Sequence, residues 1–288
     1  MNRSLLHRLL AIVAATGTAA LAVAQDPAAE APPMASAWPK LSATDVDRVV
    51  ALVTQFKKED VQLHTDATAK LLQLGAGAAP FLMQRVHDKE PNQNPQIFAV
   101  LDGMVGSEHA ELLAKELKKP SVELRGYLTQ RLCRFGDPRL RKSLEGLRKD
   151  ANERIAFHAA LGCLALGDAA ALDQVVAYSK THWADEVGIV SEVLSKVRSA
   201  AAGNEVFAAI AKQKPVDQMA TLRIARYLAI PDHQVIVKTY LASADHTVKK
   251  EAVNVCRVLA GEPPLEKLDV FQTIKHANEW LQKLGGKP

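Results

Sequence analysis

The sequence predicts an all-α protein, and more narrowly an α-solenoid of about seven stacked helix-turn-helix units. Three observations predict this: turn signals recur about every 31 residues, apolar residues before each turn follow helical spacing, and strand signals are weak. Aromatic residues make up only 5% of the chain, and no useful run alternates between apolar and polar residues. The turn signals are Leu74-Gly75, Val105-Gly106, Phe135-Gly136, Leu166-Gly167, Ile230-Pro231 and Ala260-Gly261.

The interval between these turns is regular along most of the chain. Gly75 and Gly261 lie 186 residues apart, which is six intervals of 31. The turn expected near residues 200–203 is less distinct, and the unit around residues 182–214 departs most from the pattern. One helix pair of this size cannot cover its own apolar faces, so neighbouring copies must bury them by stacking.

The first 24 residues have the pattern of a secretory signal peptide. Arg3, His7 and Arg8 precede an apolar stretch from Leu9 to Val23, and small residues end at Ala24. This stretch is shorter than the roughly 20 residues that a spanning helix needs. We therefore expect cleavage after Ala24, a mature chain outside the cytoplasm (periplasmic or secreted), and no membrane span in it.

Residues 25–40 are rich in Pro and Ala and predict a disordered linker. The repeat array is expected over residues 41–288. Its first helix, Thr44–Glu59, places apolar residues on one face, as an end helix requires. The last helix, near Val270–Leu284, is expected to bury four apolar residues: Ile274, Ala277, Trp280 and Leu281.

Each unit reads as helix, tight turn, helix. Glycine at the turn supplies the left-handed conformation that ends a helix without a Cβ clash. The residues after the turn begin the second helix, and their side chains are expected to accept its unpaired N–H groups. These residues are Ser107, Asp137 (followed by Pro138), Asp168, Asn204 and Asp232.

Two stretches resemble the HEAT and HEAT-like repeat family. The first is Ala67-x3-Leu71-x2-Leu74-Gly75-x2-Ala78-x-Pro80-x-Leu82, and the second is the run from Glu153 to Leu172, with a looser match at residues 248–261. The resemblance implies a curved α-solenoid that binds proteins or other partners. Some HEAT-like members are bilin-chromophore lyases, but no chromophore-handling motif is present here.

Composition argues against nucleic-acid binding. Removing Arg3 and Arg8 with the signal segment lowers the formal net charge from +4 to +2, which is close to balanced. The three cysteines, Cys133, Cys163 and Cys256, lie in apolar helical runs and are expected to be buried small residues. A Cys133–Cys163 disulfide stays open as an alternative, although stacked helices usually hold such Cα atoms too far apart.

The sequence contains no strong catalytic, cofactor or metal-binding motif. It has no phosphate-binding loop, paired-histidine zinc helix or serine-nucleophile elbow, and the histidines are scattered. We expect no cofactor, no metal and no catalytic residues, with the histidines at surface or helix-cap positions.

Two groups of residues are candidates for partner binding. Residues 115–154 carry twelve Lys or Arg against six Asp or Glu, and this bias could attract an anionic partner. The second group is aromatic and lies where the 31-residue spacing of the turns becomes irregular. The candidates are Arg139, Lys142 and Lys149 on one stripe, Arg141 and Arg148 on another, and Tyr178 and Trp183. The alternatives are a solvated basic face and a Trp183 packed between units.

The leading hypothesis for function is an exported, non-catalytic scaffold that binds a protein or peptide along its groove. A lyase-like enzyme or accessory subunit would need titratable groups that converge in one pocket. A structural or assembly component would show an exposed apolar strip at one end helix.

Overall fold

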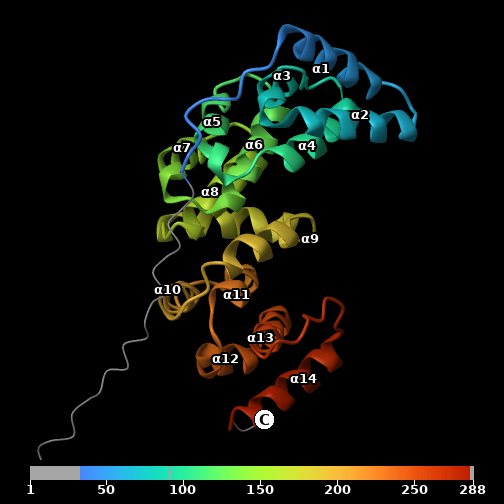
Figure 1. Ribbon diagram of the computed structural model, residues 1–288. Coiled ribbons are helices and arrows are strands. Elements are labelled where there is room, and N and C mark those ends of the chain that lie inside the picture. Colours follow the sequence, from blue (N-terminus) through green and yellow to red (C-terminus); the bar gives the residue numbers. More distant parts are fainter. Residues whose placement is uncertain (1–32, 91, 286–288) are drawn as a thin grey trace, which may run out of the picture. The chain divides into compact units, whose positions relative to one another are not determined.

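The computed structural model describes residues 33–90 and 92–285, and this part of the chain is helical and contains no strand (Figure 1). The predicted all-α class is confirmed. The predicted signal peptide and residues 25–32 of the predicted linker lie outside the described residues. The helices are α1 (Ala43–Gln55), α2 (Val61–Leu74), α3 (Ala79–Met83), α4 (Gln93–Met104), α5 (Ala110–Glu116), α6 (Val122–Phe135), α7 (Arg141–Leu147), α8 (Glu153–Ala165), α9 (Leu172–Ser195), α10 (Ala200–Ile210), α11 (Pro215–Leu228), α12 (Gln234–Leu241), α13 (His246–Leu259) and α14 (Val270–Lys283).

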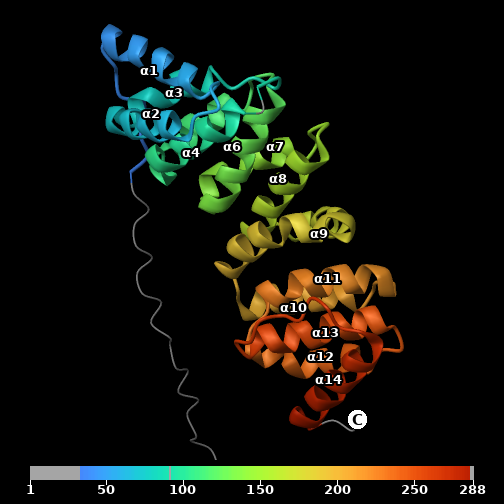
Figure 2. The ribbon, with the colours of Figure 1, turned by 90° about the vertical axis from the view of Figure 1, so that its right-hand side faces the viewer.

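Helices pack on those that lie one or two positions away in chain order. Close pairs include α6 with α8, α8 with α9, α9 with α11, and α11 with α13. Figure 2 shows α10, α11, α12 and α13 side by side. The buried apolar residues form one continuous cluster from Val49 in α1 to Leu281 in α14. Burial between neighbours, rather than around a single centre, is therefore what stabilises these short helices.

Glycine ends the first helix at most of the predicted turns. Gly75, Gly136, Gly167 and Gly261 have φ values of 67°, 62°, 85° and 80°, in the left-handed region that a Cβ disfavours. The side chains of Asp137 and Asp168 then accept backbone N–H bonds, as predicted. Short 3₁₀ turns begin five of the second helices: η1 (Gly75–Ala78), η2 (Ser107–His109), η3 (Pro138–Leu140), η4 (Ala169–Ala171) and η5 (Pro231–His233).

Two turns use a different cap from the one predicted. Gly106 has a φ of −109°, and its N–H donates to Nδ1 of the buried His109 at 3.3 Å. The N–H of Ile230 donates in the same way to Nδ1 of the buried His233 at 3.2 Å. A histidine three residues on thus replaces the predicted Ser107 and Asp232 caps, because its ring nitrogen reaches back over the turn.

The irregular unit begins inside a long, broken helix. Helix α9 has 24 residues and is interrupted at His182, where φ and ψ are −114° and 18°. Ser199 caps α10, and Asn204 lies inside that helix, so the prediction that Asn204 begins a helix was wrong. The helix runs without interruption through Ala200–Gly203 because it already begins at Ala200, where the side chain of Ser199 supplies the capping oxygen.

At the two ends of the described chain, the apolar faces of the helices are covered differently from those in the middle. In α14, Ala277, Trp280 and Leu281 are buried as predicted, but Ile274 is 42% exposed because none of the helices of residues 33–90 and 92–285 covers that side. At the other end, residues 34–40 contact the helices: the Ala35 N–H donates to the Glu108 carbonyl at 2.8 Å, and Trp38 stacks on His109.

Candidate binding site

An apolar cleft of about 560 Å³ lies between the α8–α9 turn and α10 in the described part of the chain. Small side chains leave this space open, among them Ala169 on one wall and Ala201 on the other. Leu172 and Val206 supply apolar surface, and Asp173, Glu205 and Lys212 place charges at the cleft. An apolar pocket with a few charged groups is the usual form of a ligand or side-chain receptor.

Most arginines of the predicted basic stretch contact neighbouring helices or turns. Arg148 donates to Asp168 at 2.8 Å and to Gln174 at 3.1 Å, and Arg141 donates to the Leu166 carbonyl. Arg139 is exposed but forms an ion pair with Asp137 at 2.6 Å. Acids outside residues 115–154 neutralise much of the local excess of positive charge, since Asp102, Glu192, Asp168 and Glu186 all pair with its arginines.

The exposed lysines of the same stretch lie on two second helices. Lys142 on α7 and Lys149 just beyond it are exposed, and so are Lys115 and Lys118 at the end of α5. None of the four has an ion pair within the described residues. The stretch therefore keeps a modest basic surface that consists of lysines, rather than the five-residue set predicted from the sequence.

The two predicted aromatic candidates lie in different surroundings. Tyr178 is half-buried in a stack of rings, with its centroid 4.6 Å from Phe157 and 4.1 Å from His182. Trp183 is only 6% exposed, and the guanidinium carbons of Arg223 and Arg226 lie 5.5 and 5.4 Å from its ring centroid. Trp183 therefore packs between α9 and α11, which is the alternative that the sequence left open.

Sequence reasoning missed two buried ion clusters. The Glu251 carboxylate, 3% exposed, pairs with Arg223 at 3.0 Å and with the fully buried Arg226. The Glu186 carboxylate, 2% exposed, accepts from Arg154 at 2.7 Å and pairs with His158 Nε2 at 2.9 Å. Burial opposes ionisation of Glu186, but the bonds from His158 and Arg154 hold its pKa below the ordinary value. Opposite charges 25 to 32 residues apart, close to one repeat, are the signal that could have found them.

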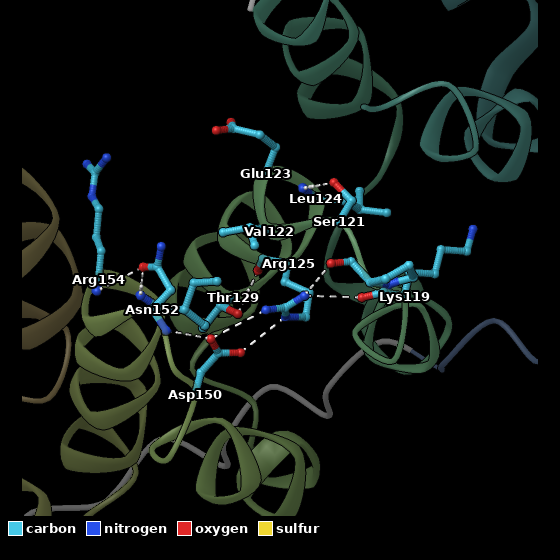
Figure 3. A network of polar contacts seen from close by, with 12 residues as sticks. Lys119, Ser121, Val122, Glu123, Leu124, Arg125, Thr129, Asp150, Asn152 and Arg154 are labelled. Atoms are coloured by element: carbon cyan, nitrogen blue, oxygen red, sulfur yellow. Dashed lines mark hydrogen bonds and ion pairs between the residues drawn. The ribbon is translucent and has the colours of Figure 1, made fainter. Parts of the chain in front are cut away.

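A similar pair ties α6 to the turn before α8. Arg125 donates to Asp150 at 3.1 Å and to the Pro120 carbonyl at 2.8 Å, and the backbone N–H of Asn152 donates to Asp150 at 2.9 Å (Figure 3). Burial opposes ionisation of Asp150, yet the bonds from Arg125 and Asn152 hold the pKa of its carboxyl below the ordinary value.

This pair predicts a dependence of stability on acid. Because the native pKa of Asp150 lies below its unfolded value, the pair stabilises the fold above about pH 4, and the contribution is lost as pH falls through the native pKa. We expect Asp150→Asn to lower the free energy of unfolding by about 1–3 kcal/mol at neutral pH. The variant should also lose less stability than the wild type on acidification, as measured by urea unfolding at several pH values. An unchanged acid dependence would contradict the role given to Asp150.

No three His, Cys, Asp or Glu residues in the described part of the chain are placed to hold a metal ion. The three cysteines are free and buried, and burial raises the pKa of the Cys133 and Cys256 thiols to about 12. The Cys133–Cys163 disulfide is absent. Within the same residues, no helix combines the length and apolar character needed to cross a bilayer.

The described residues thus define a class, an all-helical protein whose helices pack on those nearby in chain order and carry an apolar cleft and buried inter-helix ion pairs. Comparisons with protein-family models, curated proteins and solved structures give no match to this chain.

Proposed function

We propose that the chain is an exported, non-catalytic α-solenoid of the HEAT-like type, and that it binds a protein or peptide partner. The partner's apolar side chain enters the cleft between the α8–α9 turn and α10. The observation that carries this proposal is that cleft, which is apolar, open and bordered by charges of both signs. Export is inferred from the signal-peptide pattern of residues 1–24.

The positions of the first helices support a seven-unit array. Six of them begin at Val61, Gln93, Val122, Glu153, Pro215 and His246. The successive intervals are 32, 29, 31, 62 and 31 residues, and 62 is twice the repeat length. The half of α9 that follows the break at His182 supplies the missing first helix, with α10 as its second helix. The irregular unit, which lines one wall of the cleft, thus keeps the register of the others.

Filling the cleft tests the proposal. Ala201 is exposed and lines the cleft, so Ala201→Trp should occupy its space without entering the core. We expect this variant to lose about tenfold or more in affinity for peptides selected on the mature wild-type protein from a random synthetic library. Isothermal titration calorimetry would measure the loss, and the selected peptides should share an apolar anchor residue.

A matched variant controls for the added indole. Ala208 is exposed on the same helix, α10, but does not line the cleft. Ala208→Trp should bind the selected peptides as the wild type does. Equal affinities of the Ala201→Trp and wild-type proteins would remove the cleft as the binding site.

One observation favours an assembly component as a second candidate. Val270, Phe271 and Ile274 lie close together at the start of the end helix α14 and are 52%, 77% and 42% exposed. Such an apolar strip favours association of end helices, although three residues are few beside a standard interface of about 800 Å² per partner. Size-exclusion chromatography of the mature chain separates this candidate from the first.

A further inference from the structure

A second hollow, polar and of about 250 Å³, lies between the first halves of α6 and α8. Its walls combine two apolar residues with charged groups, side-chain amides and an imidazole. The lining residues are Val122, Glu123, Gly126, Gln130, Asn152, Arg154, Ile155 and His158. This hollow, which we call the α6–α8 pocket, is separate from the apolar cleft, and the two share no lining residue.

Gly126 keeps the α6–α8 pocket open. It lies inside α6, where glycine costs about 1 kcal/mol relative to alanine. No turn requires it, since its φ is not positive, and a Cβ at this position would meet only Ile155 Cγ1, at 3.9 Å. Neither backbone conformation nor packing therefore accounts for this glycine. What it does is leave space between the two helices, because any larger residue would extend a side chain toward Ile155.

Arg154 presents an oriented guanidinium at this pocket. Its Nε donates to Glu186 Oε1 at 2.7 Å, and the other carboxylate oxygen of Glu186 pairs with the buried His158 at 2.9 Å. The Arg154 side chain is still 56% exposed, and among the described residues its two Nη atoms form no hydrogen bond. A guanidinium fixed through Nε and open at Nη is arranged for a two-pronged bond to a planar anion.

The other polar groups of the pocket restrict the class of ligand that it can bind. Glu123 and Arg154, from α6 and α8, extend in the same direction in Figure 3, and both line the pocket together with Asn152. The Asn152 oxygen accepts the N–H groups of Arg154 and Ile155, which leaves its amide nitrogen for a ligand. Glu123 forms no ion pair within the described residues and disfavours a highly charged anion such as phosphate. Gln130 adds a second amide that can bond to a peptide backbone.

We propose that the α6–α8 pocket binds a single carboxylate of the peptide partner, held by the Nη atoms of Arg154 and flanked by the amides of Asn152 and Gln130. This inference rests on the proposed function, since it gives the partner a second anchor besides its apolar side chain. The carboxylate belongs either to an acidic side chain or to the C-terminus of the peptide, and the experiment below separates the two.

The probes are synthetic peptide mixtures in four forms. Each mixture has a free or an amidated C-terminus, and contains either Asp and Glu or only Asn and Gln at the varied positions. Binding to the mature wild-type chain is compared with binding to two variants. Arg154→Gln removes the guanidinium, and Gly126→Leu fills the α6–α8 pocket. We expect both variants to lose about tenfold or more in affinity for the form that carries the recognised carboxylate. Neither should change in affinity for the fully neutral form.

Arg134→Gln is the matched control, since Arg134 also pairs with an acid of another helix, Glu192 at 2.8 Å, but does not line the pocket. It should bind all four forms as the wild type does. Arg154→Lys keeps the positive charge but not the two Nη donors, so it should lose part of the affinity. Thermal unfolding checks that each variant is folded. Equal binding of acidic and neutral forms, or equal binding by wild type and Arg154→Gln, overturns the inference. If binding still depends on Ala201→Trp in that case, the proposed function stands without it.

Discussion

Replacing Glu251 by leucine is expected to lower the free energy of unfolding by about 3–5 kcal/mol. Arg226 is fully buried, and Glu251 is the acid that it contacts most closely. Without Glu251, Arg226 would keep only a 3.6 Å contact to the exposed Glu266 and its stacking over the Trp183 ring. A buried cation without a close counter-ion has lost its hydration and gained little in return. Urea unfolding followed by far-UV circular dichroism would measure the loss.

A double variant separates loss of the charge pair from loss of packing. Glu251→Leu combined with Arg226→Met removes both charges and keeps the volume apolar, so most of the lost stability should return. Glu192→Leu is the surface comparison, since the Glu192–Arg134 pair is 44% and 28% exposed and its loss should cost less than about 1 kcal/mol. A double variant as unstable as Glu251→Leu would show that the pair matters through its shape rather than its charge.

Replacing Trp183 by alanine is expected to cost about 3–5 kcal/mol, the range for truncating a buried aromatic side chain. Trp183 lies between α9 and α11, beneath the two arginines that hold Glu251, with Tyr227 stacked 6.4 Å away. Removing the indole would leave a cavity, and the Arg226 guanidinium would lose the ring against which it packs. Urea unfolding would measure this cost.

Trp183→Phe keeps most of the ring and should cost clearly less than the alanine variant. The indole Nε1 has no hydrogen-bond partner among the described residues, so losing it adds no unsatisfied group. If Trp183→Ala unfolds at the same urea concentration as the wild type but fails to bind the selected peptides, Trp183 is a partner anchor and the packing role is wrong.

The helices and most of their ends follow from local chemistry and were predictable. Gly136 with the Asp137 cap, and Gly167 with the Asp168 cap, act through neighbouring atoms only, so sequence spacing is enough to find them. The histidines were expected at surface or cap positions, but the sequence could not show that His109 and His233 in particular replace the Ser107 and Asp232 caps, because the capping nitrogen comes from three residues later and depends on the ring being buried.

The candidate site was much less predictable. Arg141 and Arg148 lie in a basic run, but their bonds go to residues about 20 to 26 positions away, and only the stacking of units places those partners. Both hollows have the same origin. The cleft needs the α8–α9 turn beside α10, and the α6–α8 pocket needs Gly126 opposite Ile155.

The sequence by itself determined the helical class and the positions of most turns, because helix periodicity, glycine and capping side chains act over a few residues. Only the tertiary structure decided that Trp183 is buried and that Glu186 and Glu251 each join two basic side chains, and it alone located the space left between helices. Those features depend on which faces of separate helices meet, and their energies arise from the removal of water between them.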